Sequence, residues 1–437
     1  MELVDLYFRY VHVAFHNIFH RPTFEASVRN GSVPKILIFG VISLVARFSD
    51  HEAFANIDPL VRGEPYTKET ERLLDLHKTS LVTIQACLLI AAAHVIEMQS
   101  TTESIMYSIA CRMSMIMDLP NMTASNILER EMNLRERTVA KSLNILAVWW
   151  SVVAIDTWSS SALGLPRAIE ARYDIAMPMD ERVFRQLDAD TSPEIDSSVR
   201  SPSRSLIAQM ILLNQILFKV NLFNKDVVLG PLGDDVVNER VKQLSKELDD
   251  WYSKLPNDMR YSPENISYWI GESCGSTFVI LHMNYNHSSQ LLLYRFLHLS
   301  SQEEDILSAG YAKTCKMHAN QLCGIVYEMR KHPDGNARHP LGGHMLVVAS
   351  TVQLHTLLFS SDNDEVQTAK ERLQANFKII NALQIFWPSL KASLSRFDTF
   401  HQACLQGKHS FRFDRYMLRF LLDFSQPVEE RDGMCRG

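Results

Sequence analysis

The sequence LRERTVAKSLNILAVWWSVVAIDTWSSSALGLPRAI, at residues 134–169, carries the strongest fold signal in the chain. Its long apolar run contains no proline before Pro166, and this predicts a helix over residues 135–163. Gly164 and Pro166 are residue types that commonly end helices. Trp149 and Trp150 are adjacent and cannot share one helix face, so we expect one in the core and the other against a neighbouring helix.

Asp156 lies seven residues after Trp149, and therefore on nearly the same face of the expected helix. A buried carboxylate needs cationic or hydrogen-bonding partners, because burial without them is costly. The candidate partners are nearby arginines, namely Arg112, Arg135, Arg137 and Arg167. Nothing in the segment resembles a reaction centre, so we expect it to be a packing element.

Length and composition bound the fold class. The 437 residues exceed the roughly 250–300 at which a single core stops growing, so we expect two subdomains or an extended helical array. The hydrophobic fraction of 46% and the charged fraction of 22% are typical of globular proteins. Helical periodicity dominates, strand alternation is almost absent, and no fixed-period repeat is found. The sequence predicts an all-α, multi-helix array.

Apolar residues at three- and four-residue steps predict the individual helices. Residues 80–98 are apolar nearly all round, which predicts a helix enclosed by others. Residues 100–119 are amphipathic, with a capping-box pattern at Ser100 and Glu103 and a stop at Pro120. Further helices are expected at residues 2–19, 33–48, 68–76, 205–223, 235–255, 277–297, 303–330, 345–359 and 367–386. The polar residues 186–203 are the clearest linker candidate.

The net charge argues against a DNA-binding surface, and the cysteine spacing argues against a disulfide-stabilised fold. Lys+Arg 44 and Asp+Glu 50 give a formal charge of -6, whereas phosphate-binding domains normally carry a basic surplus. The cysteines stand singly in apolar stretches without a CxxC pair, which indicates buried thiols in a reducing compartment. They are Cys87, Cys111, Cys274, Cys315, Cys323, Cys404 and Cys435.

Neither secretion nor a membrane span is expected. The first apolar run contains Asp5 and Arg9, unlike the uninterrupted apolar region of a signal peptide. The apolar runs at residues 36–46 and 82–93 are shorter than the ~20 residues that cross a bilayer. The run around Trp149 is interrupted by Asp156.

A match to G-x-S-x-G at residues 271–275 invites a catalytic interpretation. This nucleophile elbow needs several βαβ units before it, and the sequence offers mainly helical segments. We therefore expect an inter-helix turn, with Ser273 as a helix-capping residue.

Two groups of histidines have spacings that a metal site could use. His12, His16 and His20 stand four residues apart, but they flank an apolar face and lack a nearby carboxylate or thiolate. The second group occurs in a stretch rich in proline and glycine that is typical of an exposed connector, and it comprises His332, His339 and His344. We interpret both groups as structural.

An acidic group invites comparison with the magnesium diphosphate motifs of all-helical terpene cyclases. Its members are Asp234, Asp235, Asn238 and Glu239, with Asp249 and Asp250 further on. The spacing fits poorly, because Asn257-Asp258 is followed by Ser262-Pro263 and proline would break the required helix. Negative charge at a helix N-terminus explains Asp234 and Asp235 better. We expect no catalytic, cofactor-binding or metal-ligating residues and no cofactor.

Five blocks, in order, resemble the regulatory (middle homology) domain of fungal-specific transcription factors. They lie between residues 3 and 167, and a sixth block, LLLYRF at residues 291–296, extends the resemblance. One departure is that the family's L-G-L-H appears here as Met117-Asp118-Leu119-Pro120. The five blocks are Leu3 to His12 with His20-Arg21-Pro22-Thr23-Phe24, similar to "HRPTF"; Leu44 to Ser49, similar to "ALAARFS"; Ser80 to Leu89 with Thr83-Ile84-Gln85-Ala86, similar to "TVQALLLL"; Cys111-Arg112-Met113-Ser114, similar to "ACRMA"; and Trp149 to Arg167.

This resemblance implies a helical regulatory domain with residues 1–185 as its N-terminal part, 186–203 as a linker or loop, and 204–437 as its C-terminal part. It implies a nuclear transcription regulator, not an enzyme, that controls a specialised-metabolite or catabolic gene set. Family members usually carry a binuclear zinc cluster ahead of this region, and the seven cysteines here do not form one.

We therefore expect the chain to act through the transcription machinery or a DNA-binding partner, as a homo- or heterodimer, and to respond to a small-molecule effector. No dense Lys/Arg run indicates a nuclear import signal, so nuclear entry would depend on a partner. Two alternatives stay open. One is a metal-dependent enzyme such as a terpene cyclase, which would need Asp234 and Asp235 in a deep pocket. The other is a scaffold or inhibitor of a zinc-cluster partner.

Overall fold

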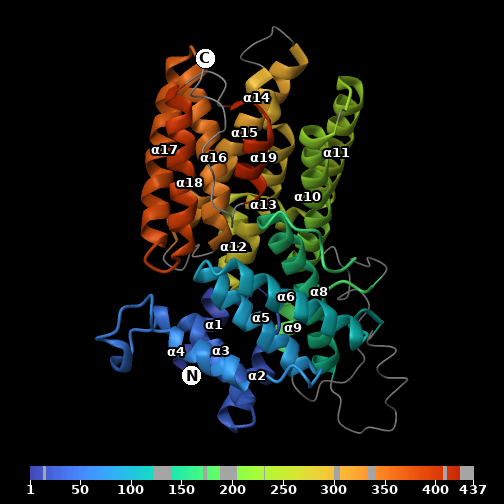
Figure 1. Ribbon diagram of the computed structural model, residues 1–437, viewed down its shortest axis with the longest axis vertical. Helices are drawn as coiled ribbons and strands as arrows, with labels where there is room; N and C mark the ends of the chain where they lie inside the picture. Colours follow the sequence, from blue (N-terminus) through green and yellow to red (C-terminus); the bar gives the residue numbers. More distant parts are fainter. Residues whose placement is uncertain are drawn as a thin grey trace. The chain divides into compact units, whose positions relative to one another are not determined.

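The computed structural model describes residues 1–12, 16–121, 139–170, 175–187, 204–230, 232–299, 306–332, 340–406 and 411–423. Within these ranges every regular element is a helix and no strand occurs, which confirms the predicted all-α class (Figure 1). The chain divides into two compact units. Unit 1 comprises Met1–Ser160, Leu165–Ile211 and Ile385–Pro388, and unit 2 comprises Ser161–Gly164, Leu212–Gln384 and Ser389–Gly437.

The division at residues 185 and 204 stays a prediction, and most of the expected linker, residues 188–203, lies outside the described residues. The boundary between the units falls inside one helix, α10, at Ile211 and Leu212.

Unit 1 is built around α5 (Leu81–Ile96), which is buried along nearly its whole length, as its uniformly apolar sequence predicts. Ser80 caps this helix, because its hydroxyl accepts a hydrogen bond from the Thr83 backbone N–H at 3.2 Å. The other helices of the unit are α1 (Glu2–Tyr10), α2 (Arg21–Arg29), α3 (Lys35–Val45), α4 (Glu64–Leu73), α6 (Ser100–Ile116), most of α8 (Val139–Ala162) and α9 (Glu181–Gln186), together with α10 (Leu206–Leu229) as far as Ile211.

Three expectations for unit 1 are wrong. The helix expected at residues 2–19 ends at Tyr10, and a separate helix, α2, begins at Arg21 directly after the chain bends. Pro22 occupies the first turn of α2, where its missing N–H costs nothing. The capping box at Ser100 does not form, because Ser100 is already helical and the Glu103 carboxylate accepts instead from the Ser159 hydroxyl at 3.0 Å. The same helix, α6, ends at Ile116 rather than at Pro120.

The carboxylate of Asp156 holds the chain where it turns back after α8. Asp156 is 4% exposed and accepts hydrogen bonds from Arg167 Nε at 3.1 Å and from the backbone N–H groups of Ala168 at 2.9 Å and Ile169 at 3.3 Å. Arg167 is therefore the expected partner that the structure confirms. Arg112 is exposed, and Arg135 and Arg137 lie outside the described residues.

Both tryptophans of the pair lie in the core of unit 1, with Trp149 0% and Trp150 1% exposed. Adjacent positions point in different directions, and Trp150 Nε1 donates to the carbonyl of Ala176, in the segment that precedes α9, at 2.9 Å. The helix ends as its sequence predicts, because Gly164 has a φ of 67°, in the left-handed region that glycine favours. The segment at residues 139–169 is thus a packing element.

A short segment late in the chain completes unit 1. Trp387 is 0% exposed and packs against Phe48, with ring centroids 5.5 Å apart. Phe386 also packs against the Phe48 ring, with centroids 5.3 Å apart. Arg47 donates to the Phe386 carbonyl at 3.0 Å and stands over the Trp387 ring. Residues 385–388 thereby belong to unit 1, although the residues on both sides of them belong to unit 2.

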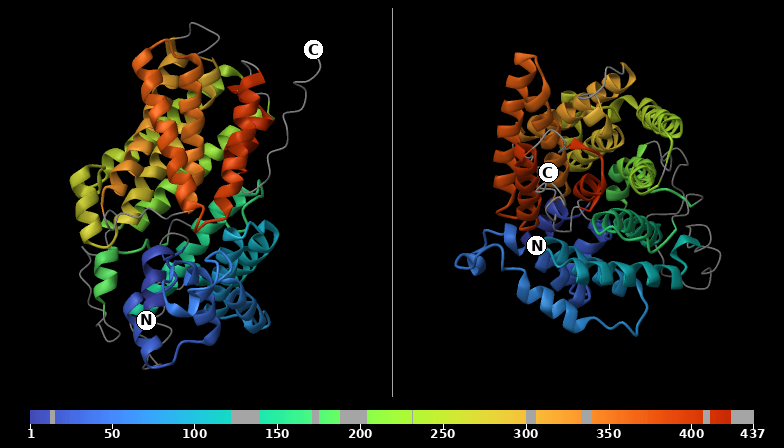
Figure 2. Two further views of the ribbon diagram at one scale, coloured as in Figure 1. Left: turned by 90° about the vertical axis from the view of Figure 1, so that its left-hand side faces the viewer. Right: turned by 45° about the horizontal axis from the view of Figure 1, so that its top comes forward.

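Unit 2 is organised around α13 (Gly275–Leu293), which is buried along nearly its full length. The long helices α15 (Ile306–Arg330), α16 (Pro340–Phe359), α17 (Asn363–Leu383) and α18 (Ser389–Gln406) run side by side, and α16 contacts the other three (Figures 1 and 2). The remaining helices are the rest of α10, α11 (Asp234–Lys254), α12 (Pro263–Gly271), α14 (Arg295–Leu299) and α19 (Arg415–Leu422). The segments α2, α9, α12, α18 and α19 were not expected as helices.

Helix α13 carries many polar side chains into the core, and each needs a partner there. His282 Nε2 donates to the Met259 carbonyl at 2.9 Å, and Asn284 Nδ2 donates to Asn214 Oδ1 on α10 at 2.8 Å. His318 Nδ1 of α15 and Asn286 Oδ1 are 2.9 Å apart. These contacts tie α13 to its neighbours within unit 2.

One described helix, α10, is long and apolar enough to cross a membrane by length and composition alone. This is weak evidence for a span, because 61% of its most apolar window is buried inside the fold, and core helices pass the same test.

Three helices end on a non-glycine residue in the left-handed conformation. Met98, Asp118 and Ser273 have φ values of 59°, 58° and 55°. After α5, the N–H of Met98 bonds to the Val95 carbonyl and the N–H of Gln99 to the His94 carbonyl, the paired bonds of a Schellman motif. Asp118 stands where the resembling family has glycine, so the helix exit is retained although the residue differs.

Replacing Asp156 by alanine should lower the free energy of unfolding by about 3–5 kcal/mol, because Arg167 and two backbone N–H groups lose their buried acceptor. Chemical denaturation followed by circular dichroism measures this. The matched control is Asp50→Ala at an exposed position, which should change stability by less than about 0.5 kcal/mol. Equal stability of the two variants would contradict the assigned role of Asp156.

The variant Met98→Gly should raise the free energy of unfolding by about 1 kcal/mol, because glycine adopts a left-handed φ without a Cβ clash. Met98→Ala removes the same half-exposed side chain but keeps the Cβ, so it should give no gain. Thermal unfolding of the two variants beside the parent chain tests this. A gain of equal size in both variants would place the effect in the side chain and not in the backbone.

Candidate functional site

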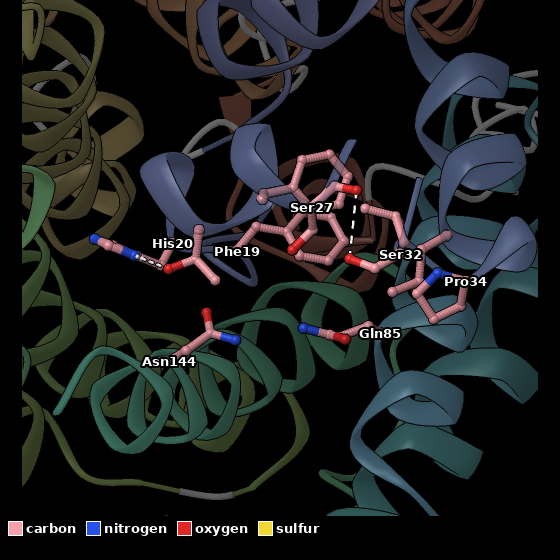
Figure 3. Close-up of a pocket in the computed structure, with 11 residues that line it drawn as sticks. Phe19, His20, Ser27, Ser32, Pro34, Gln85 and Asn144 are labelled. Atoms are coloured by element: carbon pink, nitrogen blue, oxygen red, sulfur yellow. Dashed lines mark hydrogen bonds between the residues drawn. The ribbon is translucent and has the colours of Figure 1, made fainter. Parts of the chain in front are cut away.

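A pocket of about 150 Å³ opens in unit 1 where α2, α3, α5 and α8 converge (Figure 3). It is smaller than the roughly 300–1,000 Å³ of sites for drug-sized ligands. Its wall combines apolar, hydroxyl and amide side chains. They are Phe19, His20, Thr23, Phe24, Ser27, Ser32, Val33, Pro34, Leu37, Gln85 and Asn144.

His20 fixes the wall on the α2 side. It is 3% exposed and stands directly before α2, and its Nδ1 and Thr23 Oγ1 are 2.7 Å apart. Its Nε2 donates to the Phe184 carbonyl at 2.8 Å. Both ring nitrogens are thereby occupied, which sets the orientation of the segment before α2.

Two amide side chains face Phe19 and Ser27 across the pocket (Figure 3). Gln85 is 5% exposed, and its Nε2 donates to the Ile18 carbonyl at 2.7 Å. Asn144 Oδ1 is shielded from solvent and has no hydrogen-bond partner within the described part of the chain. Neither residue was predicted from the sequence as part of a site. An amide inside an otherwise apolar helix is the signal that could have found each one.

The three N-terminal histidines are not aligned along a helix, because α1 ends at Tyr10. Each is directed to a different partner. His12 Nε2 donates to the Phe19 carbonyl at 3.0 Å, and His16 Nε2 and the Tyr7 hydroxyl are 2.9 Å apart. Burial lowers the pKa of both His12 and His16 to about 3, which keeps the rings neutral. Both rings are thus held by contacts within unit 1.

The later histidines are likewise not brought into one loop. His344 lies inside α16, is 5% exposed and packs edge-on against the buried His287 ring, with centroids 5.5 Å apart. His332 follows the end of α15, and His339 lies outside the described residues. Across the described ranges, no group of three or more His, Cys, Asp or Glu side chains is arranged to hold a metal ion.

The acidic residues of α11 lie on the surface. Asp234 and Asp235 are exposed in the first turn of the helix, where the helix dipole favours negative charge. Pro263 occupies the first turn of α12 after Ser262, whose hydroxyl caps that helix. Asp234 and Asp235 therefore do not converge on a deep pocket, as a terpene cyclase would require.

Ser273 lies in an inter-helix turn, as expected. The N–H of Ser273 bonds to the Ile270 carbonyl and the N–H of Cys274 to the Trp269 carbonyl, which closes α12 with a Schellman motif. Ser273 thus caps the C-terminus of α12 through its backbone, which adopts the left-handed conformation. A nucleophile elbow would need a strand before the serine, and α12 stands there instead.

The cysteines in the described residues are buried free thiols, as predicted for Cys87, Cys111, Cys274, Cys315, Cys323 and Cys404. Burial raises the pKa of the Cys87 thiol to about 12 and that of Cys323 to about 11. Thiols with raised pKa values are poor nucleophiles and poor metal ligands at neutral pH. Cys435 lies outside the described residues.

Buried histidines should make unfolding strongly pH-dependent. Burial lowers the pKa of His282 and His318 to about 4 and that of His287 and His355 to about 3. A histidine with a lowered folded-state pKa stabilises the fold above its unfolded pKa of about 6.5, and that stability is lost as the pH falls toward the folded pKa. Several carboxyls act in the opposite direction, because burial raises the pKa of Glu103 to about 7 and also raises the pKa of Glu97, Glu181, Asp249 and Asp423. The described histidines with a lowered pKa are more numerous, since His12, His16 and His344 belong to them as well.

The free energy of unfolding should therefore fall as the pH is lowered from 7 to 5, with each buried histidine contributing about 1–2 kcal/mol. The variant His282→Gln should reduce this fall by about one such contribution, measured by denaturant titrations at several pH values. His77→Gln, at an exposed position, is the control and should leave the pH profile unchanged. A free energy of unfolding that does not change with pH, with the same result in His282→Gln, would contradict the lowered pKa values of these rings.

Comparison with known proteins places this arrangement in a family. The model described as "Fungal specific transcription factor domain" matches residues 4–253. The chain is 26% identical over 340 residues to an uncharacterized transcriptional regulatory protein of Schizosaccharomyces pombe, covering 70% of this chain and 33% of the relative. It is 21% and 22% identical to the Zn(2)-C6 fungal-type transcription factors FTF1c and FTF2 of Fusarium oxysporum f. sp. lycopersici, covering 88% of this chain and 44% and 38% of theirs.

The chain thus spans between a third and a half of the length of these relatives. The matched family is one of transcription factor domains and not of enzymes. Because the match covers more than half of the 437 residues, this protein belongs to the fungal-specific transcription factor domain family.

Proposed function

We propose that this chain is the regulatory part of a nuclear transcription regulator that controls a specialised-metabolite or catabolic gene set. The observation that carries the proposal is the family match over residues 4–253, together with relatives named as transcriptional regulators. Both units are compact and helical, and the described thiols are buried with raised pKa values, which suits a regulatory body.

We propose that contact with DNA is supplied by another module or partner protein. The formal charge of -6 gives no basic surplus to attract phosphates. The described cysteines are buried separately within the two units, whereas a binuclear zinc cluster needs thiolates gathered around its metal ions. The described residues would then act through protein contacts, with the transcription machinery or with a DNA-binding partner, as a homo- or heterodimer.

The proposal predicts that loss of the folded regulatory domain changes transcript levels of a coordinated set of genes. A strain whose own gene carries Asp156→Ala should show this change, because the predicted loss of stability in unit 1 lowers the amount of folded protein in the cell. A strain with the surface substitution Asp50→Ala should resemble the parent. Transcript sequencing under several nutrient conditions measures both. Unchanged transcripts in the Asp156→Ala strain, with the protein confirmed as depleted, would contradict the proposal.

A further inference from the structure

We propose that the pocket of unit 1 binds a small uncharged molecule in which an amide group is attached to a single apolar ring. The inference goes beyond the proposed function and does not depend on it, because binding at this pocket is a property of unit 1 alone. Three features of the pocket carry it: its charge, its unused hydrogen-bonding groups and its aromatic wall.

The pocket selects against charged ligands. None of its eleven lining side chains is an aspartate, glutamate, lysine or arginine. An ion that enters such a site loses its hydration and gains no opposite charge, which is costly. Uncharged ligands escape this penalty.

The pocket also offers hydrogen-bonding capacity that the protein leaves unused. The side-chain amide of Asn144 makes no hydrogen bond within the described part of the chain, and its Oδ1 is shielded from solvent. Gln85 also lines the pocket and is held in place by its bond to the Ile18 carbonyl. A ligand amide has two N–H donors and one carbonyl acceptor, so it can pair with a side-chain amide in either orientation.

The opposite wall is aromatic and preorganised. The rings of Phe19 and Phe24 are stacked with centroids 4.4 Å apart, and both residues are less than 7% exposed. Figure 3 shows Phe19 facing Asn144 and Gln85, so a ligand between them would contact an aromatic face and an amide together. A volume of about 150 Å³ matches the size of cavity that holds one benzene ring.

Benzamide is the probe that combines these properties, and benzoate is its charged counterpart of nearly the same shape. We expect benzamide to bind the full chain with a dissociation constant of about 1 mM or tighter, as ligand-observed and protein-observed NMR titrations would measure. Benzoate should bind at least tenfold more weakly at pH 7.5.

Two substitutions locate the binding. Asn144→Leu removes the amide at similar volume and should weaken benzamide binding about tenfold. Ser27→Phe fills the pocket and should abolish binding. The control Asn238→Leu, on α11 in unit 2, should bind as the parent does. Melting curves of all four proteins establish that each is folded before its affinity is compared.

The proposal is overturned if folded parent protein shows no benzamide binding up to about 10 mM. It is also overturned if Asn144→Leu and Ser27→Phe bind as the parent does, because the ligand would then occupy another site. Equal affinity for benzoate would refute the assigned ligand class.

Discussion

The buried carboxylate of Asp156 is the interaction on which the arrangement of unit 1 depends. A charge at 4% exposure is tolerated because a guanidinium and two backbone N–H groups surround it, and those groups come from the chain that follows the same helix. Gly164 ends α8, and the side chain of Asp156 then fixes the direction in which the chain leaves the helix. Trp150 extends the effect, since its bond to Ala176 holds the next stretch against the same helix.

The helices that were predicted correctly are those whose hydrophobic pattern alone defines them. Helices α5 and α8 follow from unbroken apolar runs, and α18 could have been found from its buried Leu390, Phe397, Phe400 and Cys404, which recur at helical spacing. The break between α1 and α2 was missed because aromatic and apolar residues continue through the bend. The pocket was beyond reach, because Gln85 and Asn144 meet His20 only through packing of distant segments.

Three helices end on a residue with a positive φ, and none of the three is the glycine that this conformation favours. At Asp118 the geometry that a family pattern assigns to glycine is adopted by an aspartate, whose carboxylate accepts from Asn121 Nδ2 at 2.6 Å. Short polar side chains tolerate this conformation because they can bond locally. Met98 has no such compensation, so the surrounding packing of α5 and α6 must hold its backbone in place. The backbone conformation of the family's helix exit is thus kept although its glycine is replaced.

The segment at residues 385–388 makes the two units interleaved along the chain although each has its own core. A fragment that stopped at residue 384 would contain every helix of unit 1 and still lack Trp387, leaving the Phe48 ring and the Arg47 guanidinium without their buried partners. A fragment that began after residue 211 would in turn carry an unpartnered tryptophan. No single cut therefore yields two pieces that each keep every segment of their own unit.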